Sequence, residues 1–368
     1  MTADPPTALT QPVDLKGMPP EELTEFVVRS GEAPYRARQV MSWLYEKDVS
    51  NLDRMTDLPK SWRSGMAARI RITRLEELER RESVVDATVK FLFGIPGSTS
   101  VESVLISEGS RRTACLSSQV GCPLDCKFCA TGKMGFKGRN LTSGEIIDQL
   151  LRLNAWAADS GERVTNVVMM GMGEPLLNYE NVTRALRVMG VAGLGIGGRR
   201  ITVSTAGFVP GIEKLSMEKD LNVGLAISLN ATMDEQRTRI MPINRKFPIA
   251  RLLQAAREYF DRRGRRVTFE YVLMDQITDS DEDARRLAEL TSDIPCKINL
   301  IPYNELESSS LEGGAFKRPS EARIRTFRRI LDERAVASRT VTLRESKGRD
   351  IAAACGQLYR EPAITGSS

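Results

Sequence analysis

The sequence contains no histidine among its 368 residues. Imidazole is the usual general base near neutral pH, a proton shuttle and a common metal ligand, so every mechanism that needs an imidazole is excluded. The chemistry of this chain must therefore use thiols, carboxylates, amides or a bound cofactor.

Long apolar runs are absent as well. No stretch approaches the roughly 18 apolar residues of a membrane helix, and Met1–Pro6 lacks the basic and apolar regions of a secretory signal. We therefore expect a cytoplasmic protein that makes no membrane contact. Apolar residues at 41% and charged residues at 27% are ordinary for a globular protein, and the length allows a barrel-sized domain plus a smaller one.

The net charge is only +5. Such a balance does not by itself indicate a protein that binds nucleic acid. A local basic run, Arg262–Arg266, could contact RNA or simply end a solvated helix, and the sequence leaves both interpretations open.

The two ends of the chain, residues 1–17 and 361–368, have the composition of loose, disordered tails. Residues 18–72 have a helical pattern that begins at Pro19–Glu22, where proline and acidic residues open a helix. We expect a helical accessory domain over this range.

Residues 73–110 predict a small β-hairpin linker region. Val89–Phe93 and Val101–Ile106 are strand-like, and they flank a turn at Pro96–Ser98.

Residues 111–360 alternate short apolar strands with amphipathic helices. This alternation predicts an α/β fold with a parallel sheet and right-handed crossovers. About six strand–helix units fit a partial (β/α)6 barrel better than a closed eightfold one, and the chemistry of such barrels lies at the C-terminal ends of the strands. The candidate strands are 113–118, 164–170, 200–204, 222–229, 266–273, 296–301 and 339–344, and the candidate helices are 143–158 (after a capping box, Thr142 to Glu145), 179–189, 248–263, 281–291 and 321–334.

Four of the six cysteines fall within fifteen positions, at 115, 122, 126 and 129. A Cys-x3-Cys-x2-Cys loop after the first barrel strand can place Cys122, Cys126 and Cys129 on one concave face. Three thiolates can bind three irons of a [4Fe–4S] cluster and leave the fourth iron open for chemistry. The alternative is a zinc site, whose fourth ligand would have to be Cys115 or a carboxylate. A disulfide framework is not expected in a cytoplasmic protein.

This loop, with Phe128 before its last cysteine, resembles the hallmark of the radical-SAM superfamily. The resemblance implies a radical-SAM barrel in which the open iron chelates S-adenosylmethionine and reduction releases a 5′-deoxyadenosyl radical. The segment Met170–Pro175 follows the second strand and resembles the glycine-rich motif that holds the amino group of the cofactor in that superfamily.

Further motifs resemble one family more closely, the dual-specificity 23S rRNA and tRNA adenine carbon-2 methyltransferases. The N-terminal segments Arg36–Val40 and Thr56–Pro59 resemble the accessory domain of that family. The barrel motifs occur in the family's order, at Ser117–Cys122, Met170–Asn178, Ser204–Thr205, Met241–Asn244, Leu300–Asn304 and Ala354–Leu358.

The family resemblance implies a two-stage reaction with two S-adenosylmethionine molecules. Carbon 2 of adenine is electron-poor and does not attack a sulfonium methyl group, so one molecule first methylates a cysteine thiolate, which is a good nucleophile. The second molecule supplies the radical that activates the S-methyl group for addition to the base, and a second cysteine releases the product as a disulfide forms. By motif, Cys355 is the methyl carrier, Cys115 the resolving thiol and Glu102 the general base. Cys296, which begins an apolar strand, is expected to be a small core residue.

The same resemblance assigns the remaining cofactor contacts to Gly173, Glu174, Ser204, Ser228, Leu229, Asn230 and Asn304. Asn230 stands where the family usually has histidine. The stretch from Asn304 to Pro319 is also longer than is typical, and its role is open.

The expected partners are 23S rRNA before full ribosome assembly, tRNA, and an electron donor such as flavodoxin or ferredoxin, and the protein is expected to be a monomer. The candidate RNA contacts are Lys133, Lys137 and Arg139 beside the cluster loop, with Arg36 and Arg38 on the accessory helices.

Two alternatives remain at this point. One is the related carbon-8 adenine methyltransferase, which neither composition nor spacing separates from the carbon-2 enzyme. The other is a non-catalytic RNA-binding protein that is stabilised by a metal at the cysteine loop.

Overall fold

The computed structural model describes residues 12–97, 99–133, 136, 138–306, 310–311 and 314–359. The predicted tail at 361–368, residues 1–11 of the N-terminal tail and the candidate contact Lys137 lie outside these residues. None of the helices in the described part of the chain is long and apolar enough to cross a membrane.

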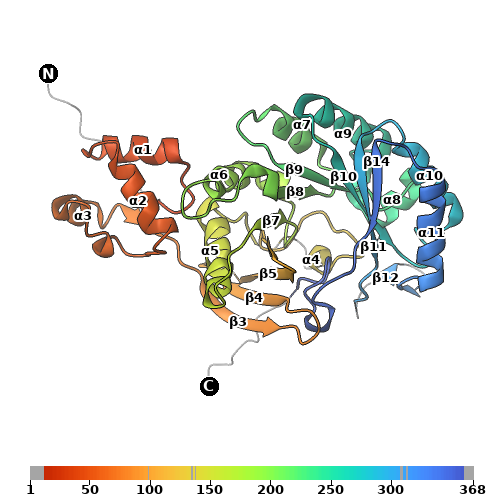
Figure 1. The fold of residues 1–368 in the computed structure, drawn as a ribbon, viewed down its shortest axis with the longest axis horizontal. Helices are drawn as coiled ribbons and strands as arrows, with labels where there is room; N and C mark the ends of the chain where they lie inside the picture. The colour runs from red at the N-terminus through yellow and green to blue at the C-terminus, as the bar shows by residue number, and fades with distance from the viewer. Residues whose placement is uncertain are drawn as a thin grey trace.

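The N-terminal region is helical, as predicted, and lies to one side of the barrel (Figure 1). Its first helix begins at a proline whose missing N–H costs nothing at that position, and Glu21 and Glu22 in the first turn complement the helix dipole. Its elements are α1 (Pro20–Arg29), α2 (Arg36–Tyr45), the 3-10 turn η1 (Leu52–Arg54) and α3 (Lys60–Met66).

The prediction of a loose tail as far as residue 17 is wrong for residues 13–17. Strand β1 (Val13–Asp14) pairs in parallel with β2 (Ile70–Arg71), and Leu15 and Lys16 are fully buried. Gly17 has φ +86°, and a Cβ there would lie 2.3 Å from the backbone nitrogen of Gly144. Pairing over two residues leaves no periodic signal, which is why composition alone suggested a tail.

The barrel strands form the parallel part of one ten-stranded sheet, ordered β14-β11-β10-β9-β8-β7-β6-β5-β4-β3. Six strand–helix units are followed by a last strand, β14, so the predicted partial barrel is confirmed. Figure 1 shows α7, α9, α10 and α11 on the outer side of the curved sheet. The parallel strands are β6 (Arg111–Cys115), β7 (Asn166–Met169), β8 (Ile201–Thr205), β9 (Gly224–Ser228), β10 (Val267–Leu273), β11 (Cys296–Pro302) and β14 (Arg339–Leu343).

The predicted hairpin forms, and it continues the barrel sheet instead of only linking two domains. Strands β3 (Glu76–Glu82), β4 (Val89–Gly94) and β5 (Ser100–Glu108) are antiparallel, and β5 pairs with β6. Residues 89–93 are all buried, which requires cover on both faces of the sheet.

The helices agree with the predicted ranges to within one residue at most ends, and the capping box of Thr142 with Glu145 is present. The five predicted helices are α5 (Ser143–Asp159), α6 (Tyr179–Met189), α9 (Ile249–Arg263), α10 (Asp281–Leu290) and α11 (Glu321–Glu333). Three further helices lie outside the predicted ranges: α4 (Ala130–Lys133), α7 (Val209–Met217) and α8 (Asp234–Ile240). Short 3-10 turns lie at η2 (Pro175–Asn178), η3 (Gly198–Arg200), η4 (Pro242–Arg245) and η5 (Arg349–Ile351), and the long stretch after Asn304 contains the small antiparallel pair β12 (Ser310–Leu311) and β13 (Gly314–Ala315).

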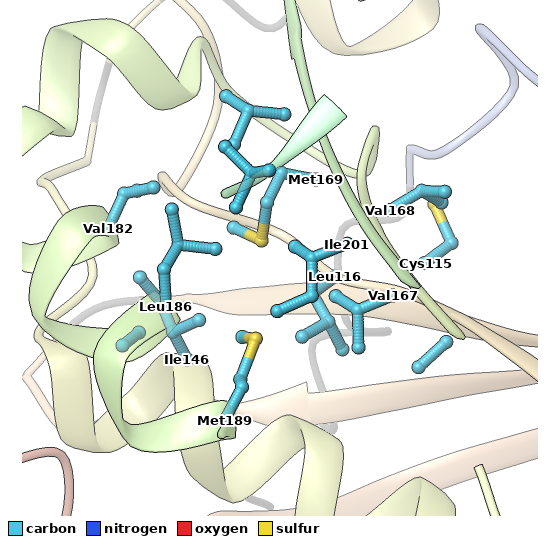
Figure 2. Close-up of a cluster of buried hydrophobic side chains, with 14 of the residues drawn as sticks. Cys115, Leu116, Ile146, Val167, Val168, Met169, Val182, Leu186, Met189 and Ile201 are labelled. Atoms are coloured by element: carbon cyan, nitrogen blue, oxygen red, sulfur yellow. The ribbon is translucent and has the colours of Figure 1, made fainter. Parts of the chain in front are cut away.

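Strand alternation separates the barrel core into two sides. In Figure 2, Met169 of β7 lies with Ile146 of α5 and with Leu186 of α6. Cys115 and Val168, which are register partners, point to the opposite side of the sheet. The alternation therefore turns the Cys115 thiol away from the helices.

A buried charge network joins the accessory region to α5. Lys16 Nζ donates to Asp148 at 2.6 Å, with both side chains fully buried, and the Leu75 backbone N–H donates to the other oxygen of Asp148 at 2.7 Å. Arg152, one turn along α5, pairs with Asp48. Every charge here has an opposite partner, as burial requires.

Candidate functional site

A cavity of about 170 Å³ lies at the C-terminal ends of the barrel strands. Of the sequence-predicted site residues, Cys122, Cys126, Cys129, Gly173, Glu174, Ser204, Ser228, Asn230, Asn304 and Cys355 line it. The structure thus brings together residues more than 200 positions apart in the chain. Leu229, Cys115 and Glu102 are not on its wall.

The three loop cysteines lie on a tight turn before α4. The Cys129 N–H donates to the carbonyl of Cys126 at 3.1 Å, and a Cβ on Gly132 would lie 2.7 Å from that same carbonyl, so glycine lets α4 pack on the loop. Burial raises the pKa of all three thiols, that of Cys122 to about 12. Binding to iron must therefore displace the thiol protons.

The donor set fits an iron–sulfur cluster, since it consists of three free thiols facing one cavity. Over the described ranges, no three His, Cys, Asp or Glu side chains converge closely enough to hold a single metal ion. The cluster assignment therefore depends on the shared cavity and on the family of the chain.

The glycine-rich segment after β7 is fixed against the cluster loop. Gly173 has φ +97°, and a Cβ there would lie 2.5 Å from the side chain of Gln119. The Glu174 N–H donates to Gln119 Oε1 at 2.8 Å, while the Glu174 carboxylate accepts from the N–H groups of Leu176 and Ala206. Burial raises the pKa of Glu174 to about 7.

Asn230 holds the turn that follows β9. Its φ is +59°, a left-handed conformation that asparagine tolerates better than most residues. Its Oδ1 accepts from the Val272 N–H at 3.0 Å and its Nδ2 donates to Met241 Sδ at 3.4 Å. The side chain thus fixes the end of β9 against β10, and only its position on the cavity wall agrees with the predicted cofactor contact.

Sequence reasoning missed Arg237, a fully buried residue of α8. Its guanidinium donates to the carbonyls of Ala206, Ser228 and Leu229, so one side chain ties together the ends of β8 and β9. No pattern in the sequence distinguishes Arg237 from Arg239, the exposed arginine of the same helix.

The C-terminal segment places the exposed Cys355 on the cavity wall. The Ala130 N–H donates to the carbonyl of Gly356 at 2.7 Å, and Thr131 Oγ1 donates to that of Leu358 at 2.7 Å. Asn304 Nδ2 donates to the carbonyl of Cys355 itself at 3.2 Å. Three bonds to two elements therefore hold the Cys355 thiol beside the cluster loop.

Cys115 lies beneath the cavity wall. Burial raises its pKa to about 12, the negative charge of Cys355 adds to this rise, and Arg344 opposes it. Cys115 ends β6, so it lies at the same end of the barrel as the cavity that Cys355 lines. Cys296 begins β11 and is buried at the opposite, N-terminal end of the strands, as expected for a core residue.

Glu102 is buried in β5, with 1% of its surface exposed. Its Oε1 pairs with Lys90 Nζ at 2.9 Å, and Lys90 also donates to the carbonyl of Ala352 at 3.1 Å. Within the described part of the chain, Glu102 Oε2 has no hydrogen-bond partner. The sequence analysis did not single out Lys90. A signal was present, because Lys90 is the one lysine of an apolar strand and Glu102 lies in the strand that pairs with it.

The basic candidates separate into two groups. Lys133 and Arg38 are exposed, whereas Arg139 pairs with Glu145 and Arg36 donates to the carbonyl of Asp57. The run 262–266 lies before β10, at the end of the barrel away from the cavity. Arg262, Arg263 and Arg265 contact residues 216–222, and Arg266 donates to Thr340.

Two family models match the chain, the Radical SAM superfamily over residues 116–288 and the ribosomal RNA large subunit methyltransferase N-terminal domain over residues 13–72. A dual-specificity RNA methyltransferase RlmN of Geobacter sulfurreducens is 47% identical over 94% of this chain and 92% of its own length. The chain belongs to the RlmN family. An RlmN of Anaeromyxobacter sp. (strain Fw109-5) is 45% identical over 97% of this chain and 93% of its own length.

A solved structure agrees with the RlmN assignment. The crystal structure of a radical SAM methyltransferase from Sphaerobacter thermophilus superposes with a TM-score of 0.86 at 43% identity, and the match covers 94% of this chain and 99% of that one. Membership of the RlmN family makes the chain a radical SAM methyltransferase and implies S-adenosylmethionine and a [4Fe–4S] cluster.

Proposed function

We propose that this chain methylates carbon 2 of an adenine in 23S rRNA and in tRNA through an S-methyl group on Cys355. The observation that carries the proposal is the position of Cys355, an exposed thiol on the same cavity wall as Cys122, Cys126 and Cys129. Relatives that are 44% to 47% identical are named dual-specificity RNA methyltransferases, which supports RNA as the substrate.

Cys122, Cys126 and Cys129 would hold the cluster, which supplies the electron that cleaves S-adenosylmethionine. Gly173 and Glu174 would receive the amino group of the cofactor, because the Glu174 carboxylate lines the cavity and is already oriented by two backbone N–H groups. Ser204, Ser228, Asn230 and Asn304 would bind the rest of the cofactor, with Leu229 and Arg237 supporting the turn from beneath.

Of the three thiols outside the cluster loop, the proposal assigns roles in the reaction to Cys355 and Cys115. Cys355 takes a methyl group by displacement on the sulfonium, which releases S-adenosylhomocysteine. The radical from the second S-adenosylmethionine would remove a hydrogen atom from the S-methyl group, and the methylene carbon would then bond to carbon 2. The cluster, oxidised when the cofactor was cleaved, would take up one electron from this adduct, and Glu102 would remove the proton from carbon 2. Cys115 then attacks the Cys355 sulfur. This step breaks the sulfur–carbon bond, and the electron pair left on the methylene carbon takes up a proton to give the methyl group. The methylated base is released, and a Cys115–Cys355 disulfide remains for an external thiol to reduce.

The surroundings of each residue support the role proposed for it. Cys355 can meet the cofactor because it is exposed in the cavity. Burial raises the pKa of Cys115 to about 12, so this thiol stays protonated and is a poor nucleophile while Cys355 is methylated. Glu102 has one carboxylate oxygen, Oε2, that no group of the described structure occupies.

Recognition of the RNA is proposed to involve both parts of the chain. Pulling an adenine out of its stack costs a few kcal/mol of free energy. Contacts to the shape and phosphates of the RNA outside the cavity must therefore supply the affinity. Lys133 beside the cluster loop and Arg38 on α2 are exposed and suited to phosphates. A cytoplasmic location, a monomeric state and a flavodoxin or ferredoxin as electron donor complete the proposal.

The test is mass analysis of adenosines from 23S rRNA of a strain that lacks the gene, before and after incubation with purified, cluster-reconstituted protein. We expect 2-methyladenosine to appear with wild-type protein and not with Cys355→Ala. Formation of 8-methyladenosine would instead identify the carbon-8 enzyme, and a colourless, zinc-containing protein that binds RNA without methylating it would identify the non-catalytic alternative.

A further inference from the structure

One acceptor on the cavity wall has no role in the reaction described above. Glu270 of β10 is only 6% exposed and lines the cavity. Its Oε1 accepts a hydrogen bond from Asn299 Nδ2 at 3.0 Å, and its Oε2 has no hydrogen-bond partner among the residues that the structure describes. A buried carboxylate oxygen without a donor is costly, which points to a donor that arrives with a ligand.

The structure around Glu270 holds this carboxylate in place. Glu270 is the register partner of Asn299 on β11 and of Ser228 on β9, and neighbouring residues in register share a face of a parallel sheet. Thr342 of β14 donates to Asn299 Oδ1. Three adjacent strands therefore fix the Glu270 carboxylate through Oε1 and Asn299, and none of the described residues pairs with its other oxygen.

Arg344 adds a donor to the same wall. It follows β14, lines the cavity and donates to Met170 Sδ at 3.9 Å, a weak bond that leaves guanidinium N–H groups for a ligand. The negative charges of Cys355 and then Glu270 hold the pKa of Arg344 above its usual range. The guanidinium thus lies within electrostatic reach of both the methyl-carrying thiol and the unpartnered acceptor.

This set of groups complements one edge of an adenine base. Adenine carries an amino donor beside an acceptor ring nitrogen, and carbon 2 lies on the other side of that nitrogen. Guanine has a carbonyl oxygen and an N–H at the corresponding positions, which would face a carboxylate and a guanidinium unfavourably. Enzymes that act on an extruded base read this edge by hydrogen bonds.

We propose that Glu270 and Arg344 form the subsite of the cavity that recognises adenine, with Glu270 Oε2 accepting from the amino group and Arg344 donating to the ring nitrogen. The inference rests on the proposed function, and it adds the residues that select the base. Both the RNA target and S-adenosylmethionine carry adenine, so the experiment must separate the two sources.

The test uses Glu270→Gln in the full-length, cluster-reconstituted protein. Asn299 Nδ2 would still bind the amide oxygen, so the amide NH2 would face the cavity and replace an acceptor by a donor. Two ligands are compared in each of two arms. The RNA arm compares the methylation rates of target RNA and of the same RNA that carries purine, which lacks the amino group, at the methylated position. The cofactor arm compares the binding constants of S-adenosylmethionine and its purine analogue, measured by equilibrium dialysis.

Wild-type protein should prefer adenine over purine by about 10- to 100-fold in one arm, the usual effect of one hydrogen bond to a charged group. Glu270→Gln should reduce that preference to about one. A loss of preference in the RNA arm assigns the subsite to the target base, and a loss in the cofactor arm assigns it to S-adenosylmethionine. An unchanged preference in both arms overturns the inference.

Two controls separate a specific loss of adenine preference from a general loss of activity. Glu289→Gln removes a carboxylate on the exposed face of α10 and should leave both preferences as they are. The preference is a ratio within one variant, so a partly misfolded sample lowers both rates and leaves the ratio intact. If wild-type protein methylates no adenine RNA at all, the proposed function fails, whereas an active wild type with an unaltered Glu270→Gln ratio defeats this inference alone.

Discussion

Two buried lysine–carboxylate pairs of this chain differ in how completely the carboxylate is satisfied. At the joint between the accessory region and α5, Asp148 accepts from Lys16 through one oxygen and from the Leu75 N–H through the other. In the barrel sheet, Glu102 pairs with Lys90 through Oε1 while Oε2 has no hydrogen-bond partner. A completed network stabilises a structure, and an incomplete one keeps an oxygen available for chemistry.

The thiols near the incomplete pair should show the largest effects. Cys355→Ala should abolish RNA methylation yet keep reductive cleavage of S-adenosylmethionine, because the cluster ligands are untouched. Cys115→Ala should trap a covalent RNA–protein adduct through Cys355, visible as a band of reduced mobility. Cys296→Ala, a buried cysteine at the far end of the strands, is the matched control and should stay active. Absence of an adduct with Cys115→Ala would show that Cys115 is not the resolving thiol.

Glu102→Gln addresses the incomplete pair directly. We expect RNA methylation to fall by about 10²- to 10⁴-fold, the usual contribution of a general base, while cofactor cleavage continues. Because buried Lys90 would lose its charged partner, the free energy of unfolding should also fall, by no more than about 3–5 kcal/mol. Rates come from incorporation of labelled methyl groups, and stability from denaturant unfolding. A variant with full methylation activity would assign Glu102 to the structure alone, as Asp148 is.

Lys16→Met addresses the completed pair. Removing one partner leaves Asp148 charged, buried and without its strongest partner, so the free energy of unfolding should fall by about 3–5 kcal/mol. Lys214→Met, which breaks the exposed pair with Glu180, should cost no more than about 1 kcal/mol. Equal losses for the two variants would mean that the joint does not depend on this network.

The buried joint also changes how the accessory region should be tested. Deleting residues 1–72 would remove the partner of Asp148 and the buried Leu15, so a loss of activity could reflect misfolding. Arg38→Gln keeps the fold and removes one exposed charge. It should weaken RNA binding and lower the slope of log K against log salt by about 0.7 to 0.9 per phosphate contact. An unchanged slope would exclude Arg38 from the RNA contact.

The sequence predicted the local structure of this chain well because the signals are local. Alternation of strands and helices gave the partial barrel, the capping box marked the start of α5, and the spacing of Cys122, Cys126 and Cys129 indicated the cluster loop. It failed at residues 13–17, where a two-residue strand pairs with Ile70–Arg71 and carries no periodicity.

By itself, the sequence determined the order of the predicted strands and helices and excluded imidazole chemistry. It also indicated which cysteines are candidates for the cluster and for the reaction. Only the tertiary structure decided which groups meet: Lys16 joins Asp148 across 132 positions, Lys90 joins Glu102 on a neighbouring strand, and Glu270 faces the cavity with Arg344 and Cys355. Helix and strand periodicity records which face of an element is apolar. It does not record which partner a buried charge will have, because that depends on how distant segments pack together.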